Sequence, residues 1–200
     1  MLIAAGSYRY EIRRAGAAIA IEEDNCTADA ISGVRRAATG DNRHEVDAAL
    51  DTAGVVARVT VRYHRGMFAR TATYEADGEA LRGRVSAVAG HNEVVVKLGR
   101  FREIDADLIL FRALLIAHIR ARGQTQWTGR IAMIDPNTLV AAALKQSVRQ
   151  SDEQGLRWVY EARMGDTEEI ELDADGRITR VRDGWGVEKI LSGFAATPAG

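Results

Sequence analysis

Residues 108–119 read LILFRALLIAHI, and only Arg112 and His118 interrupt the run of apolar side chains. On a helical repeat of 3.6 residues, Phe111 and Leu115 share one stripe, and the remaining apolar residues cover most of the surface that is left. The segment is too short to cross a bilayer, which takes about 20 apolar residues. A helix that is apolar on nearly every side must be surrounded by other parts of the chain. The stretch therefore predicts a helix buried inside a globular domain.

The flanking residues indicate where this helix begins and ends. Asp105 or Asp107 is a candidate N-cap, because a carboxylate can accept hydrogen bonds from the free N–H groups of the first turn. Basic residues follow in the last turn, where the negative end of the helix dipole stabilises their charge. Gly123 is suited to the position just after the helix C-terminus. We expect a helix near residues 107–122.

Short segments of alternating apolar and polar residues lie on both sides of this helix, with glycines between them. This pattern is typical of antiparallel strands joined by tight turns. Residues 8–13 and 18–24 predict a hairpin, and residues 55–100 predict a meander of four strands. Residues 124–134 and several segments within 156–191 predict further antiparallel strands.

Residues 139–150 fit two interpretations. Asp135 as N-cap with Pro136 at the first helical position favours a helix. The alternation of Val140, Leu144 and Val148 with polar neighbours favours a strand.

These elements define a mainly β protein of the α+β class, a long curved antiparallel sheet that forms a β-roll or half-barrel around one central apolar helix. The sequence shows no repeat of fixed period and no low-complexity linker. We expect a single domain over residues 1–194 and a flexible tail over residues 195–200.

The composition narrows the class of protein. The 200 residues are 46% hydrophobic and 28% charged, as in ordinary globular proteins. Lysine and arginine total 27 against 28 acidic residues, a balance that argues against nucleic-acid binding. The single Cys26 cannot form an internal disulfide and is expected to be a small buried side chain. With no visible export signal and no membrane span, we expect a cytoplasmic location.

No motif indicates an enzyme. The serines lack a GxSxG setting, phosphate-binding glycine loops are missing, and the four histidines do not have metal-binding spacing, so we expect no cofactor and no metal. His44, His64 and His91 are expected to be exposed to solvent. Asp173 and Asp175 superficially resemble part of a calcium loop, but Arg182 stands where that loop needs glutamate, so a hairpin turn is the favoured interpretation. A non-catalytic protein is the favoured interpretation; an enzyme would require a polar cluster that converges in a pocket, for example around His118 and Arg112.

Arg112 is the most unusual residue, because a guanidinium within an apolar helix must be paired or must reach water. One interpretation is an ion pair with a carboxylate of a strand, and the other is an anchor for an anionic head group. Large aromatic residues on the strands near the helix are either core filler or the wall of an apolar pocket. The candidate ligand-binding residues are Phe111, Arg112, Leu115, His118, Trp127, Trp158 and Tyr160.

Three short motifs, DADL (105–108), IDPNTL (134–139) and ELDADGRITRVRDG (171–184), occur in the order found in a glycolipid-binding family with a spiral β-roll fold. Over residues 55–184 the chain resembles that family, and its layout is also similar to lipoprotein-carrier half-barrels. The resemblance implies a strand over residues 139–150. In place of the threonine- and proline-rich phrase of the family, this chain has the apolar segment around Arg112.

We therefore expect a protein that binds a lipid-like or amphipathic small molecule on the concave face of the roll, without catalysis. The alternative is a homodimeric scaffold or interaction protein with a fully packed core and no ligand. The volume of the space around Phe111 and Arg112 and the oligomeric state distinguish the two.

Overall fold

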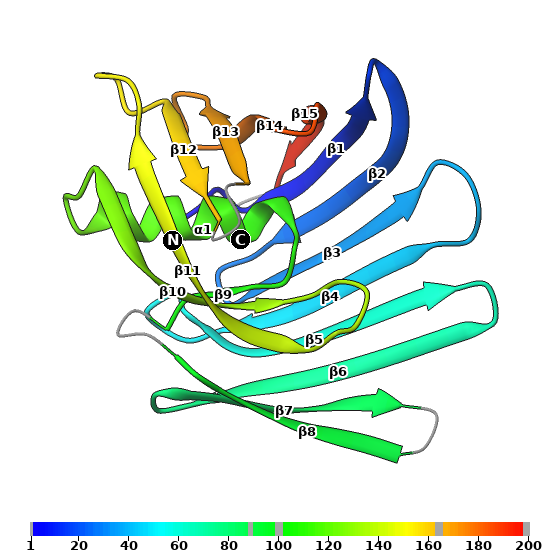
Figure 1. Cartoon of the computed structure of the whole chain (residues 1–200). Helices are drawn as coiled ribbons and strands as arrows, with labels where there is room; N and C mark the ends of the chain where they lie inside the picture. Colours follow the sequence, from blue (N-terminus) through cyan, green and yellow to red (C-terminus); the bar gives the residue numbers. More distant parts are fainter. Residues whose placement is uncertain (1, 88–89, 99–101, 163–165, 198–200) are drawn as a thin grey trace.

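The computed structural model describes residues 2–87, 90–98, 102–162 and 166–197 of the chain. In this part, fifteen strands form one continuous curved sheet with a helix on its concave side (Figure 1). The strand order is β8-β7-β6-β5-β4-β3-β2-β1-β15-β14-β13-β12-β11-β10-β9. All neighbours pair antiparallel except β9 and β10, which are parallel. The predicted mainly β architecture is confirmed.

The elements have the following bounds: β1 (Gly6–Arg14), β2 (Ala17–Cys26), β3 (Ala30–Ala37), β4 (Arg43–Leu50), β5 (Val56–Arg65), β6 (Phe68–Asp77), β7 (Ala80–Ala87), β8 (Gly90–Lys97), β9 (Ile104–Asp105), α1 (Ile109–Ala121), β10 (Gln126–Ile134), β11 (Ala141–Gln150), β12 (Arg157–Glu161), β13 (Thr167–Leu172), β14 (Ile178–Asp183) and β15 (Val187–Ala196).

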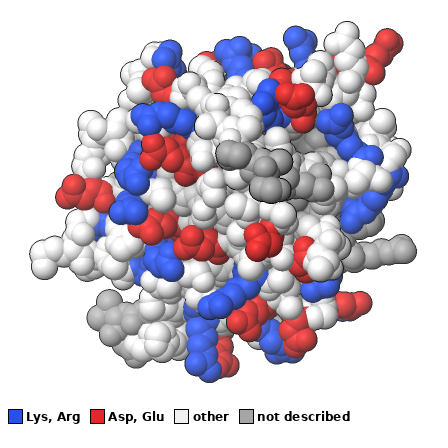
Figure 2. Space-filling view, turned by 180° about the vertical axis from the view of Figure 1, so that it is seen from behind, with Lys and Arg blue, Asp and Glu red and all other residues white. Residues whose placement is uncertain are grey.

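Strand residues point alternately to the two faces of the sheet, and the concave face is the buried one. In β1, for example, Tyr8, Tyr10 and Ile12 are buried while the residues between them are more exposed. Cys26 is fully buried on the same face, as predicted. Charged side chains of both signs are interspersed over the face of the molecule seen in Figure 2.

The helix α1 fills the space that the curved sheet encloses (Figure 1). Ten of its 13 residues are buried, including both polar ones of the opening stretch, Arg112 and His118. The helix ends as expected at Gly123, which has a φ of 66°. There the N–H of Gly123 donates to the carbonyl of Arg120 (2.9 Å) and the N–H of Gln124 to that of Ile119 (3.1 Å), the pair of bonds that closes a Schellman turn.

The predicted start of the helix is wrong in its detail. Neither Asp105 nor Asp107 is the N-cap; Leu108 takes that position and contributes no side-chain hydrogen bond. The Oδ1 of Asp105 instead accepts the N–H of Asp107 (2.8 Å), whose left-handed backbone (φ 62°) turns the chain into the helix. The first helical N–H, that of Ile109, donates to Glu22 of β2 (2.7 Å). A carboxylate on β2 therefore accepts the hydrogen bond that a neighbouring aspartate was expected to accept.

Two further segments settle questions that the sequence left open. Residues 141–150 form a strand, β11, so the strand interpretation and not the helical one is correct. The strand β15 continues through Ala195 and Ala196, which pair with Ser7 and Gly6 of β1. The ordered sheet thus extends two residues into the expected tail, and residues 198–200 of that tail lie outside the described residues.

The roll is drawn together by contacts between strands that are far apart in the sheet order. Strand β8 lies beside β11, although the two are not neighbours in the hydrogen-bonded sheet. The buried hydroxyl of Tyr74 on β6 donates to the carbonyl of Leu139 (2.6 Å) and accepts the N–H of Ala141 (3.1 Å). This hydroxyl ties the meander to the β10–β11 connection across the interior.

Candidate functional site

The seven residues predicted to bind a ligand are all buried, and four of them lie on α1. Trp127 comes from β10, and Trp158 and Tyr160 come from β12, so the predicted placement of these aromatics on strands is correct, and Tyr160 contacts Arg112 of the helix. None of the cavities described below is lined by any of the seven. As a group they are packed as core side chains in this structure.

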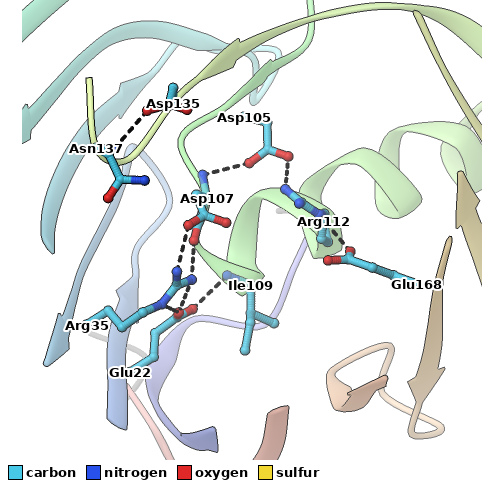
Figure 3. Close-up of polar contacts among 9 residues, drawn as sticks. All are labelled: Glu22, Arg35, Asp105, Asp107, Ile109, Arg112, Asp135, Asn137 and Glu168. Atoms are coloured by element: carbon cyan, nitrogen blue, oxygen red, sulfur yellow. Dashed lines mark hydrogen bonds and ion pairs between the residues drawn. The ribbon is translucent and has the colours of Figure 1, made fainter. Parts of the chain in front are cut away.

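Arg112 is neutralised by carboxylates of the protein itself (Figure 3). Its guanidinium contacts Asp105 and, at 3.1 Å, Glu168 of β13, and it lies 4.7 Å from the centre of the Tyr160 ring. Burial alone would lower the pKa of Arg112, but Glu168 and Tyr160 hold it above its usual value. Of the two interpretations offered by the sequence, the ion pair with a strand carboxylate is the one observed.

His118 also has an internal partner. Its Nδ1 lies 3.0 Å from Oε1 of Glu103, and both side chains are buried. Its Nε2 makes no hydrogen bond with the described residues. That nitrogen lies 3.9 Å from where a Cβ of Gly54 would stand, at the end of the roll near the C-terminus of α1. The imidazole therefore keeps one free polar atom.

A row of paired residues on β2 to β5 carries polar groups into the interior. Glu22 pairs with Arg35, Arg35 with His44, and His44 with Tyr63 across successive strands. The guanidinium of Arg35 contacts Glu22 (2.6 Å) and Asp107 (2.6 Å), which joins the sheet to the start of the helix (Figure 3). Burial alone would raise the pKa of Asp107, but the charge of Arg35 holds it below its usual value. The row fixes the position of α1.

Two buried polar side chains in this region, Asp24 and His44, make no hydrogen bond with the described residues. No N–H or O–H group among the described residues meets the carboxyl of Asp24, and neither ring nitrogen of His44 has a partner. Burial raises the pKa of Asp24 well above its usual value, and the charge of Glu22 adds to the rise. Burial lowers the pKa of His44, and Arg35 adds to the fall. The expectation that His44 is exposed is wrong.

A cavity of about 420 Å³ lies at the end of the roll that holds the C-terminal half of α1, and we call it the end cavity. Most of its exposed wall is apolar, and it reaches both Leu114 of the helix and the buried Cys26. The N-terminal segment forms one side and the β2–β3 and β4–β5 turns form the other. Its lining residues are Leu2, Ile3, Cys26, Thr27, Ala28, Asp29, Leu50, Asp51, Thr52, Ala53, Gly54 and Leu114.

A second hollow, of about 300 Å³, opens at the opposite end of the roll, and we call it the mouth pocket. It is lined by Tyr63, Arg65, Phe68, Arg70 and Asn137. The first four belong to β5 and β6, where Tyr63 faces Arg70 and Arg65 faces Phe68. These pairs are two and four residues beyond the buried pair of Val61 and Ala72, so they continue the concave face.

Sequence reasoning missed the polar row. The alternation of His44 and Val46 with acidic neighbours was a sufficient signal for a strand with one buried face, but the polar composition of residues 41–47 favoured an exposed His44. Glu22 gave no signal, because a charged residue at a core-facing position becomes meaningful only when its partners, 13 and 87 residues away, are known.

Comparisons with known proteins identify the fold but not an activity. No protein-family model matches the chain, and no curated protein is significantly similar. A β-barrel-like protein of the domain of unknown function DUF1849 from Brucella abortus superposes with a TM-score of 0.63 at 10% identity, over 98% of this chain and 99% of that one. A DUF1089 family protein from Pseudomonas aeruginosa gives 0.57 at 17% identity, over 82% and 89%. The chain therefore has a β-barrel-like fold, and glycolipid binding stays a prediction.

The described residues contain no helix that is both long enough and apolar enough to cross a bilayer. Within the same residues, no three side chains of histidine, cysteine, aspartate or glutamate gather in an arrangement that could hold a metal ion.

Proposed function

We propose that the protein binds a lipid-like molecule without catalysis, with the apolar part of the ligand in the end cavity. The observation that carries the proposal is that this cavity is walled mainly by apolar atoms and touches the enclosed helix at Leu114. Its volume lies within the range of roughly 300–1,000 Å³ that is usual for small-molecule sites. This moves the ligand from the middle of the concave face, where it was expected, to one end of it.

The polar groups at the rim of the end cavity are already engaged. Oδ1 of Asp51 accepts the N–H groups of Ala53 (2.9 Å) and Val55 (3.0 Å), and Asp29 accepts the hydroxyl of Thr27 (2.8 Å). An apolar chain in this cavity would be held by packing, because the wall is mainly apolar and the cited carboxylate oxygens already accept hydrogen bonds within their own turns.

One polar group is available behind the cavity wall. Gly54 lines the cavity. Because glycine has no side chain, none stands between the cavity and Nε2 of His118, which makes no hydrogen bond with the described residues. A hydroxyl or carboxyl group at the inner end of a ligand could bond to this nitrogen. His118, predicted as a site residue, would then act at the edge of the site, whereas Phe111 and Arg112 would support it as core residues.

A fluorescent polyene fatty acid, cis-parinaric acid, tests the proposal. Leu50→Trp places a large ring in the end cavity and should weaken binding about tenfold or more, since overpacking costs about 1–3 kcal/mol. Val95→Trp adds the same ring at an exposed position on β8 and should leave the affinity unchanged. Failure of the wild-type protein to bind, or equal binding by the Leu50→Trp variant, would refute the proposal.

The alternative, a homodimeric scaffold, is favoured by a separate observation. The seven predicted residues are packed in the core, and β8 is a terminal strand of the sheet with Val95 62% exposed. The described part of β8 is not hydrogen-bonded to β11, which lies beside it, and an unpaired strand edge can pair with a second copy. Sedimentation velocity on the wild-type protein and on Val95→Lys distinguishes the two functions, because only the scaffold requires a dimer that the lysine weakens. Under either proposal we expect a cytoplasmic location.

A further inference from the structure

The turn between β5 and β6 exposes apolar side chains to an unusual degree. Met67 is fully exposed and the adjacent Phe68 is 74% exposed, in a molecule whose other large apolar residues are mostly buried. Two large apolar side chains held in water at the tip of a hairpin are costly unless something covers them.

Arginines flank this tip on both sides. Arg65 and Arg70 line the mouth pocket, are exposed, and have no carboxylate within ion-pair distance among the described residues. Arginines nearby are different: Arg62 contacts Asp47 (2.5 Å) and Arg43 contacts Glu45 (2.6 Å). The two positive charges beside the apolar tip are therefore not paired with any carboxylate in the described part of the chain.

The loop across the pocket carries one acidic residue, Asp135, which makes no ion pair with either arginine among the described residues. Asn137 of the β10–β11 connection lines the pocket, and the carboxylate of Asp135 in the same loop accepts the N–H groups of Asn137 (2.9 Å) and Thr138 (2.7 Å). Asp135 is thereby committed to its own turn (Figure 3).

A second exposed aromatic lies at the same end of the roll. Strand pairing runs Arg14 with Val187, Ala20 with Ala37, and Arg43 with His64, so the turns that follow or precede these residues lie at one end (Figure 1). One of them is the β14–β15 turn, where the Trp185 side chain is 74% exposed. Its indole N–H donates to Asp166 (2.9 Å), which leaves the ring face outward.

We propose that this end of the roll docks on the surface of an anionic lipid bilayer. Met67 and Phe68 enter the interfacial region, and Arg65 and Arg70 meet lipid phosphate groups, with Asn137 and Tyr63 beside them in the mouth pocket. Arginine pairs with phosphate through parallel N–H···O bonds, and its apolar stem lies comfortably at the level of the head groups. Apolar side chains next to basic ones are the combination that peripheral membrane segments use.

The overall charge explains why the tip must contribute. A net charge of −1 provides no long-range attraction to an anionic surface, so binding depends on the two local arginines and on apolar insertion together. The inference concerns the end of the roll opposite the end cavity, and it holds whether or not that cavity takes a ligand.

Co-sedimentation of the full chain with vesicles tests this inference. We expect binding to vesicles of equal parts phosphatidylcholine and phosphatidylglycerol, and much weaker binding to phosphatidylcholine alone. Met67→Ser with Phe68→Ser should reduce binding to anionic vesicles about tenfold or more. Arg65→Gln with Arg70→Gln should reduce it about thirtyfold and remove the preference for anionic lipid.

Matched controls use exposed residues of the same sheet. Val95→Ser removes an exposed apolar side chain on β8, and Arg58→Gln with Arg84→Gln removes two exposed arginines that face Glu75 and Glu93; both should bind like the wild type. Circular dichroism on each variant checks folding, which surface changes at a turn leave intact. Equal binding by the tip and control variants overturns the inference. Release of the protein from anionic vesicles by millimolar inorganic phosphate would also overturn it, because it would indicate a soluble anion as the ligand. Failure of the wild-type protein to bind any vesicle would overturn it as well.

Discussion

The carboxylate of Glu22 on β2 accepts the N–H of Ile109, the first residue of α1, at 2.7 Å. The same carboxylate pairs with Arg35 (2.6 Å), which in turn contacts Asp107. One buried side chain thus satisfies a free N–H at the helix start and connects the helix to two strands. Because a carboxylate is also favoured by the positive end of the helix dipole, Glu22 fixes the helix inside the roll.

Replacement of Glu22 should therefore be costly. Glu22→Leu leaves the N–H of Ile109 without its acceptor and removes one of the two carboxylates of Arg35, which should lower the free energy of unfolding by about 3–5 kcal/mol. Glu22→Gln keeps an acceptor for Ile109 and should lose less than half of that. Urea denaturation followed by circular dichroism measures both. Equal losses in the two variants would contradict the capping role.

The burial of Asp24 makes stability depend on pH. Burial raises the folded-state pKa of Asp24 above the unfolded value of about 4. The native state then binds the proton more tightly, so this group costs stability as pH rises from about 4 toward its folded-state pKa, by about 1.4 kcal/mol for each pH unit. Asp24→Asn removes the titration with little change in the size of the side chain.

The expected outcome is a variant more stable than the wild type near pH 8, with a smaller difference near pH 4.5. Urea midpoints at the two pH values measure it. Asp41→Asn, on the exposed β3–β4 turn, is the control and should show no such pH-dependent gain. A gain in Asp24→Asn that is the same at both pH values would argue for a packing effect and against a raised pKa.

The pattern of apolar residues predicted what depends on local sequence. The alternation in β1, β2 and β5 to β8 and the all-apolar segment of α1 were sufficient for the class of fold and for the position of the helix to within two residues at each end. The start of the helix could not be predicted, because the true acceptor is 87 residues away and aspartates 105 and 107 looked adequate. Prediction of the surroundings of Arg112 was limited for a related reason: the residue is unusual by sequence, but the local pattern does not identify its carboxylates, which come from β9 and β13. The candidate ligand site stays a prediction.

Arg112 should matter for stability and not for ligand binding. Arg112→Met leaves Asp105 and Glu168 buried without their common cation and should cost about 3–5 kcal/mol. Replacing all three by Met, Leu and Leu removes the charges together and should recover most of the loss. Arg58→Met breaks an exposed ion pair with Glu75 (3.8 Å) and should lower the free energy of unfolding by about 1 kcal/mol or less. Urea denaturation measures the three variants, and a triple variant as unstable as Arg112→Met would contradict the compensation.

Gly33 on β3 leaves no room for a side chain between Asp24 and Leu108. A Cβ there would lie 2.2 Å from Oδ1 of Asp24 and 2.6 Å from Cδ1 of Leu108, the residue at the N-cap of α1. Neither neighbour has room to retreat, since both side chains are buried. Gly33→Ala should therefore lower the free energy of unfolding by about 2–3 kcal/mol.

Two further variants show whether that loss comes from crowding. Gly193→Ala, whose Cβ would meet only Arg9 at an ordinary 3.7 Å, should change stability by less than about 0.5 kcal/mol. Shortening the neighbour in the double variant Gly33→Ala with Asp24→Ser should recover part of the loss, because the serine vacates the space that the new methyl group needs. If the double variant is less stable than the sum of the two single changes, crowding against Asp24 is not the cause, and the close approach of Leu108 must account for the effect alone.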